Sequence, residues 1–189
     1  MKFQNFRICQ SDILEVKYQG KDISQVLDMS VEEAIAFFGT QSDPLARRIA
    51  ERLQPLVDVG LSYVQLGQSS SSLSGGESQR IKLASFLGKD FDARGSILFV
   101  FDEPTTGLHF HDIEKLLKAF GALVDRGHSI IVVEHNLDVI RAADWVIDLG
   151  PDAGAEGGQV VFEGTPEALA EADTWTGRAL REEMQKMKE

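Results

Sequence analysis

The sequence is poor in several features that mark whole classes of protein. Among its 189 residues there is a single cysteine, Cys9, so the chain can form no internal disulfide and has no Cys-x-x-Cys pair with which to hold zinc. No run approaches the ~20 apolar residues that a membrane-spanning helix needs, and the N-terminus lacks the long apolar core of a signal peptide. These absences exclude a disulfide scaffold, argue against any membrane association and make the cytoplasm the expected location.

Positive charge is also scarce. Lysine and arginine number 19 against 30 aspartates and glutamates, which gives a formal net charge of -11. A surface of this sign repels the phosphate backbone of DNA, so bulk electrostatics would not hold the chain on a nucleic acid. Any contact with DNA is therefore expected to be local or to be supplied by a partner.

What the chain does contain is an ordinary globular balance, with 43% hydrophobic and 26% charged residues and no internal repeat. Its first third predicts a helical lobe. Residues 30–34 begin with a capping-box pattern, and the apolar residues within 44–59 recur at three- and four-residue intervals, which is typical of an amphipathic helix. These apolar residues are Leu45, Ile49, Leu53, Leu56 and Val57.

After a serine-rich connection, short apolar runs alternate with amphipathic helices. Residues 97–101 and 130–133 are continuous apolar runs, the pattern of strands buried on both faces of a parallel sheet. Further strands are expected at 145–148 and 159–162, and helices at about 112–126 and 137–143. We therefore predict an α/β core with a mostly parallel sheet over residues 71–175, preceded by the helical lobe 1–70 and followed by a charged tail 176–189.

Residues 73–80, Leu-Ser-Gly-Gly-Glu-Ser-Gln-Arg, stand directly before a helical pattern and favour an anion site. Gly75 and Gly76 allow the backbone to come close to a phosphate, and Ser74 supplies a hydroxyl. The helix N-terminus adds free N–H groups with partial positive charge. A lone Ser-Gly-Gly would more often be a helix cap after a flexible linker, but the eight-residue string is much rarer than that.

Polar side chains follow both buried runs. Asp102 and Glu103 stand at the carboxyl end of 97–101, where open α/β sheets bind their ligands. An aspartate there can hold Mg²⁺ through water, and the adjacent glutamate can orient or deprotonate a water aimed at a terminal phosphate; a merely solvated strand end is the alternative. His135 follows 130–133 and should emerge at the same edge, where a neutral imidazole can hydrogen-bond a phosphate oxygen.

In this order, the strings LSGGESQR, ILFVFDEP and IVVEHN resemble the signature motif, the Walker B strand and the switch histidine of ABC-type ATPases. Gly107, Leu108 and His109 occupy the position of the D-loop, and the strings HNLDVI and DLGP are also distinctive. In these details the chain, from about Asp12 to Leu169, closely resembles the C-terminal part of the second ATPase module of the UvrA family of excinuclease proteins. That family recognises damage in bacterial nucleotide excision repair, and the resemblance implies a partial P-loop NTPase fold.

The resemblance also implies a role for each of these residues. Asp102 would contact Mg²⁺, Glu103 would act as the base and His135 would contact phosphate, all in the nucleotide site of the module itself. The signature residues would seat the γ-phosphate of ATP held by an opposing module: Ser74, Gly75, Gly76, Glu77 and Gln79. The implied cofactors are thus ATP and Mg²⁺.

Two features of the family are absent from the sequence. No Gly-x-x-x-x-Gly-Lys-Ser/Thr occurs, so the Walker A cradle and its lysine are missing, and Cys9 has no partner for the zinc sites that the family carries upstream. The chain is therefore expected to be inactive alone. The resemblance implies as partners the missing Walker A lobe, a second ABC module and, through the intact homodimer, the excinuclease protein UvrB and damaged DNA. Without that lobe, the strands 97–101 and 130–133 should be short of neighbours.

Three interpretations fit these motifs. The first is an enzyme fragment, the distal half of a DNA-repair ATPase, and the second is a non-catalytic truncated paralogue that acts as an interaction module with a complete ABC ATPase. A piece of a transporter ATPase is disfavoured, because the D-loop ends in His109 where transporter ATPases usually carry aspartate. An upstream Walker A reading frame would favour the first interpretation over the second.

Overall fold

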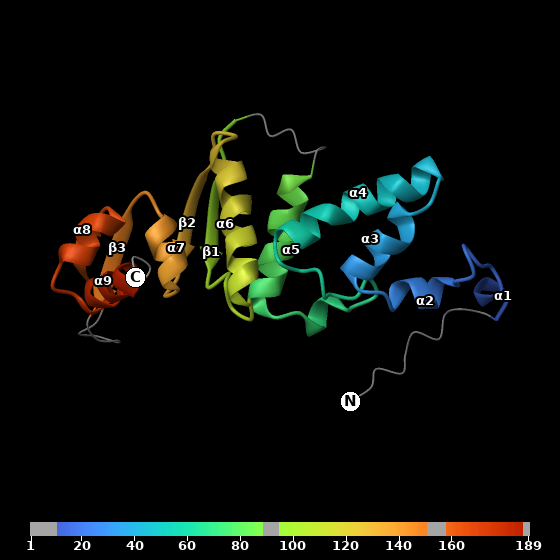
Figure 1. Ribbon diagram of the computed structural model, residues 1–189, viewed down its shortest axis with the longest axis horizontal. Coiled ribbons are helices and arrows are strands. Elements are labelled where there is room, and N and C mark those ends of the chain that lie inside the picture. The colour runs from blue at the N-terminus through green and yellow to red at the C-terminus, as the bar shows by residue number, and fades with distance from the viewer. Residues whose placement is uncertain (1–10, 89–94, 151–157, 187–189) are drawn as a thin grey trace.

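The computed structural model describes residues 11–88, 95–150 and 158–186, and it is elongated, with helices at one end and the strands toward the other (Figure 1). The helical end contains α1 (Ser11–Leu14), α2 (Ile23–Leu27), α3 (Val31–Gly39) and α4 (Pro44–Asp58). Side-chain caps from Asp22, Ser30 and Asp43 start α2, α3 and α4. A small buried cluster joins α3 to α4: Met29, Ala34, Phe38, Ala46 and Ala50. The two helices predicted in this region are thus confirmed.

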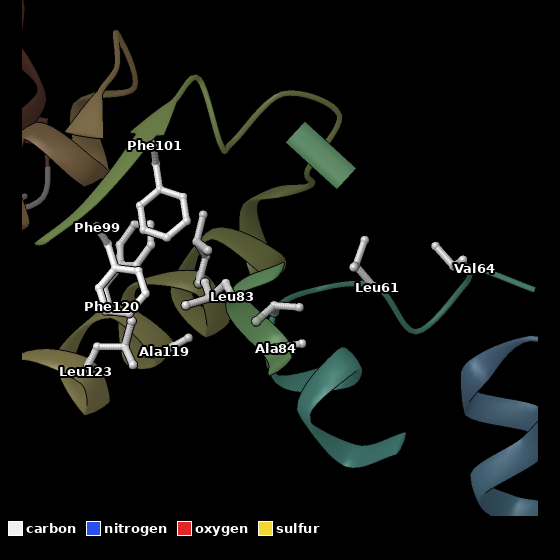
Figure 2. Packing of buried hydrophobic residues seen from close by; sticks show 11 residues of the cluster. Leu61, Val64, Leu83, Ala84, Phe99, Phe101, Ala119, Phe120 and Leu123 are labelled. Atoms are coloured by element: carbon white, nitrogen blue, oxygen red, sulfur yellow. The ribbon is translucent and has the colours of Figure 1, made fainter. Parts of the chain in front are cut away.

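The main core lies between a pair of strands and two helices. After the short 3₁₀ turn η1 (Ser70–Ser72), α5 (Gly75–Leu87) and α6 (Phe110–Val124) pack against β1 (Leu98–Asp102), which pairs with β2 (Ser129–Val133). Figure 2 shows Phe99 and Phe101 of β1 beside Phe120 of α6 and Leu83 of α5, and the rings of Phe101 and Phe120 lie 5.0 Å apart.

The same core includes residues from the first third of the chain. Val59, Leu61 and Val64 are buried in the cluster formed by β1, α5 and α6. The predicted lobe boundary at residue 70 therefore passes through a packed core. Local composition cannot show this, because the contacts join residues that are far apart in the sequence.

The parallel pair is covered on one face. Its register runs from Leu98 opposite Ser129 to Asp102 opposite Val133. Phe99 and Phe101 are buried, whereas Leu98 and Val100, which point to the other face, are 58% and 64% exposed. Within the described residues β1 and β2 pair only with each other. The prediction that these strands are buried on both faces was wrong, because one face is exposed.

A second pair of strands follows. The helix α7 (Leu137–Ala142) leads into β3 (Val146–Gly150), which pairs antiparallel with β4 (Gln159–Gly164) around a bulge next to Asp148. The parallel pairing that we predicted is therefore found between β1 and β2, while β3 and β4 form a separate hairpin-like sheet in the part of the chain that the structure describes. None of the described helices is long and apolar enough to cross a membrane.

The last described residues form α8 (Pro166–Glu171) and α9 (Trp175–Lys186), and only α9 overlaps the predicted charged tail 176–189. Leu180 of α9 is fully buried against Leu169 of α8, with Met184 one turn further on beside it. The guanidinium of Arg181 donates to the carbonyl oxygens of Ala170 at 2.6 Å and Ala172 at 3.3 Å. Residues 176–186 are thus a packed helix, because apolar residues four apart give this charged segment one buried face.

Candidate functional site

The polar residues that follow β1 and β2 lie at one edge of the sheet. The two strands run parallel with Asp102 opposite Val133, so both following turns leave the sheet on the same side. Asp102 and Glu103 belong to the first turn and His135 to the second, and all three are exposed. The structure thus places the carboxylates and the imidazole that the sequence analysis singled out at one edge of the sheet.

The backbone of Asp102 is held by a side chain of α5. The Gln79 amide nitrogen donates to the Asp102 carbonyl oxygen at 3.0 Å, and the Gln79 amide oxygen accepts the Asp102 N–H at 3.1 Å. Successive residues of a strand turn their backbone groups to opposite edges, so these groups of Asp102 point away from β2. The amide therefore takes the place of a neighbouring strand and fixes the backbone from which the carboxylate projects.

The N-terminus of α5 is capped by side chains of the chain itself. Ser74 Oγ accepts the Glu77 N–H at 3.2 Å, and Glu77 Oε2 accepts the Ser74 N–H at 2.7 Å, which together form a capping box. Glu77 Oε1 accepts the Tyr63 hydroxyl at 2.6 Å. This last bond is the main cause that lowers the pKa of Glu77, while burial, followed by the same bond, raises the pKa of Tyr63. Both oxygens of Glu77 are therefore engaged within the fold.

The two glycines of the motif have different surroundings. A Cβ built on Gly75 would meet no heavy atom within 4 Å. On Gly76 it would lie 3.3 Å from Arg80 Nη1 and from the Thr106 carbonyl oxygen, and 3.4 Å from the Glu103 carbonyl oxygen. Gly76 thus allows α5 to lie directly against the turn that follows β1, whereas Gly75 leaves open space at the start of the helix.

Arg80 is completely buried against the same turn. Its Nη1 donates to the carbonyl oxygens of Pro104 at 2.6 Å and Thr106 at 3.2 Å, while its Nε and Nη2 are buried without a hydrogen-bond partner. At the head of the turn, Glu103 has a φ of +46°, in the left-handed region that residues other than glycine rarely adopt. A strained residue is thus supported by an arginine from α5.

The segment at the D-loop position leads into α6. Gly107 has a φ of +78° with open space around it, and the Leu108 N–H donates to the Thr105 carbonyl oxygen at 2.9 Å. Leu108 packs on the main core, and His109 is the N-cap residue of α6 without a side-chain cap bond. Leu108 therefore anchors the segment, while Gly107 and His109 on either side of it are exposed to solvent.

One further glutamate joins the two turns. Glu134 Oε1 accepts the N–H of Thr105 at 2.8 Å and the hydroxyl of Thr105 at 2.6 Å. Glu134 Oε2 accepts the N–H groups of His135 at 3.1 Å and Asn136 at 3.3 Å. The turn after β1 and the turn after β2 are therefore connected through a single carboxylate.

The residues at this edge suit a magnesium ion that shares its coordination with a ligand. No group of three or more His, Cys, Asp or Glu residues in the described ranges could hold a metal ion. Mg²⁺ commonly takes one or two carboxylates and completes its shell with water and phosphate, and the exposed side chains of Asp102 and Glu103 fit that requirement. The prediction that this chain has no zinc site depends on Cys9, which lies outside the described residues.

Known proteins resemble the chain over nearly all of its length, although no protein-family model matches it. It is 56% identical over 171 residues to UvrABC system protein A of Methanothermobacter thermautotrophicus and 56% identical over 169 residues to that of Thermus thermophilus. These matches cover 90% and 89% of this chain and 17% of each relative. The crystal structure of UvrA2 from Deinococcus radiodurans aligns with a TM-score of 0.73 at 45% identity, over 91% of this chain and 20% of that chain.

Over about 90% of its length, the chain is thus similar to UvrA proteins. It corresponds to the C-terminal region of UvrA, and its mixture of helices with a parallel strand pair is part of a P-loop NTPase core of the ABC type. The chain spans 17% of the length of the curated UvrA relatives.

Sequence reasoning missed three residues of this UvrA region. Tyr63 carried no signal of its own, since only the structure brings it against Glu77. Arg80 stood inside the signature string and Glu134 directly before the switch histidine, so each was quoted within a motif without a role. Their roles depend on contacts across 24 to 29 residues of sequence, which spacing cannot show.

Proposed function

We propose that the chain is the C-terminal part of the second ATPase module of a UvrA protein, and that it acts in ATP hydrolysis coupled to recognition of DNA damage in nucleotide excision repair. The observation that carries this proposal is the shared edge of β1 and β2, which the residues Asp102, Glu103 and His135 follow and to which Gln79 attaches α5. Identity above 50% to UvrA proteins over nearly the whole chain supports it.

One half of a nucleotide site would lie at that edge. Asp102 would hold Mg²⁺ together with water and phosphate oxygens, and the bound ion would neutralise charge on the phosphoryl group during transfer. Glu103 would orient the attacking water and accept its proton, and His135 would donate a hydrogen bond to a γ-phosphate oxygen. The exposed positions of all three side chains leave them open to such a ligand.

The other half is the N-terminus of α5, which would act on ATP held by an opposing module. Ser74 Oγ accepts the Glu77 N–H, which leaves its own hydrogen free to be donated to a phosphate oxygen. Gly75 leaves room for that phosphate beside the first turn, whose N–H groups and dipole attract an anion. Glu77 and Gln79, whose polar atoms bind other parts of the chain, would shape this seat.

The rest of the module would complete both the sheet and the site. Within the described residues, β2 and β3 each pair along one edge, and a strand placed between them would join the two sheets. The exposed apolar face of β1 and β2 is a surface that the missing Walker A lobe would cover. The lobe would also bring the phosphate cradle and lysine that this sequence lacks. The excinuclease protein UvrB, damaged DNA and the second protomer would be partners of the assembled protein.

Hydrolysis of labelled ATP tests the proposal, with this chain compared with a version extended upstream to include a Walker A lobe. We expect the extended chain to turn over ATP in the presence of Mg²⁺ and the Glu103→Gln variant to lose at least about 100-fold in rate. Glu163→Gln, which alters an exposed carboxylate on β4, is the matched control and should keep the rate.

The chain without the extension should show no turnover above its own Glu103→Gln variant, because the missing cradle removes the charge stabilisation that dominates phosphoryl transfer. Turnover above that control would contradict the proposal. An inactive extended chain that still binds a complete UvrA would instead support a non-catalytic interaction module.

A further inference from the structure

Both oxygens of the Glu134 side chain are fully used in linking the two turns of the site. Two hydrogen bonds come from Thr105 after β1, at 2.8 and 2.6 Å, and two come from the backbone after β2, at 3.1 and 3.3 Å. All the partners are donors, and the residue is partly buried. An amide of the same shape would turn an N–H₂ group against one pair of these donors, so the site requires a carboxylate and not merely a side chain of this size.

Glu134 makes these contacts next to the residues proposed to react. Thr105 lies two positions after Glu103, in the turn closed by the bond from the Thr106 N–H to the Glu103 carbonyl oxygen at 3.1 Å. On the other side, His135 follows Glu134 directly. The strand ladder ends where the Glu103 N–H donates to the Val133 carbonyl oxygen at 2.9 Å, and the bonds of Glu134 continue the connection beyond that point.

The turn needs such support because its first residue is strained. The left-handed backbone of Glu103 persists only where the surroundings over-determine it. Arg80 donates hydrogen bonds to the carbonyl groups of the turn, and Glu134 accepts hydrogen bonds from the N–H and hydroxyl groups of Thr105. The two residues therefore hold the acceptors and the donors of the turn, respectively.

We propose that Glu134 is a positioning residue that fixes the Glu103 turn relative to His135, so that the carboxylate and the imidazole converge on the same phosphate. The inference rests on the function proposed above, since it concerns the same site. Glu134 would act through Thr105 and through the backbone of His135, without touching nucleotide itself.

Amide hydrogen exchange followed by NMR tests the connection in this chain. Glu134→Gln is expected to speed exchange of the Thr105 and Asn136 amides at least about tenfold, because it removes acceptors of charged hydrogen bonds. Exchange in β1 should stay the same, which separates a local effect from unfolding. Thr105→Val removes only the hydroxyl donor, and it serves as a milder second variant if Glu134→Gln does not fold.

Kinetics in the extended chain test the positioning. Glu134→Gln and Thr105→Val should lower kcat, the former by about 10- to 100-fold, with KM nearly unchanged, because misplacement of reacting groups costs that much. Thr105→Ser keeps both donors and should keep kcat, and Glu163→Gln is again the control. The double variant should be no slower than Glu134→Gln alone, since both changes break one link.

Two results overturn the proposal while leaving the proposed function intact. Unchanged exchange at Thr105 in Glu134→Gln would mean that the connection does not hold in solution, and an unchanged kcat despite faster exchange would mean that it does not position the reaction. If the unaltered extended chain hydrolyses no ATP, the proposed function fails and the positioning role fails with it, while the exchange data still show whether Glu134 holds the two turns.

Discussion

At the scale of single residues, the two glycines of the signature motif have separate tasks. Gly76 is packed against Arg80 and the turn that begins at Glu103, whereas Gly75 borders open space. The sequence pattern treats both as glycines that admit a phosphate. Packing gives Gly76 the close contact between α5 and the turn, and it leaves open space beside Gly75.

Alanine substitutions should separate these tasks. Gly76→Ala is expected to lower the free energy of unfolding by about 1–3 kcal/mol, because its methyl group needs two backbone carbonyl oxygens at 3.3 and 3.4 Å to move. Gly75→Ala should change stability by less than about 1 kcal/mol, in the stabilising direction, because it restricts the unfolded chain. Urea unfolding measures both, and equal destabilisation by the two variants would contradict the assignment.

The site residues that sequence reasoning found and those that it missed differ in kind. Asp102, Glu103 and His135 stand within two residues of the end of an apolar run, so chain position alone places them near the end of a strand. Arg80 and Glu134 act through contacts with distant turns, and a buried arginine has the same local signature as an exposed one. Periodicity and spacing report local geometry, so they could not identify either residue.

At the scale of elements, α5 is anchored at its first turn by the hydrogen bond from Tyr63 to Glu77. The bond lowers the pKa of Glu77 from 4.5, so its contribution to stability is present above that pH and is lost as the pH falls through the lower pKa of the folded chain. Burial and the bond raise the pKa of Tyr63 from 10.0, so the contribution is also lost as the pH rises beyond that value.

Stability measured against pH should therefore report this anchor. Urea unfolding of the chain and of Tyr63→Phe should differ most between about pH 5 and pH 9, by no more than about 1 kcal/mol because the tyrosine is half-exposed. The difference in the free energy of unfolding should shrink in acid, where Glu77 is protonated both in the unaltered chain and in Tyr63→Phe. A difference that stays constant down to the acid limit would rule out the charged bond as its cause.

The elements themselves were predicted better than their arrangement. The apolar patterns located α3, α4, α6 and α7 and the four strands to within a few residues. The short helix α2 was missed because five residues are too few to show a period, although Asp22 and Gln25 form a capping box around it. The antiparallel pairing of β3 with β4 was also missed, since strand direction depends on partners and not on local composition.

At the scale of the whole molecule, the open face of the β1–β2 sheet should promote self-association. Val100 and Ile131 are 64% and 52% exposed on that face, among other apolar side chains. Light scattering should show mass rising with concentration, and a double substitution of Val100→Lys with Ile131→Lys should suppress the rise with little change in Tm. Leu45→Lys, at a residue 64% exposed on α4, is the matched control. A monomer at all concentrations would contradict this expectation.

Binding to DNA should be weak for the chain by itself. With a net charge of -11 it cannot release many counterions from a duplex, so we expect a Kd no tighter than about 1 μM at low salt and loss of binding in moderate salt. Fluorescence anisotropy with a labelled duplex at two salt concentrations measures this. Tight binding that resists salt would place a DNA contact within the chain itself.

The contact between Gln79 and Asp102 has a consequence for how the sheet can grow. Within the described residues no strand pairs with Leu98 and Val100 on the outer edge of β1, whereas the backbone groups of Asp102 are bonded to the Gln79 amide. A strand arriving at this edge would be stopped one step before the carboxylates. Gln79 therefore ends strand pairing at Asp102, so another strand can cover the outer edge of β1 while the side chains of Asp102 and Glu103 stay exposed.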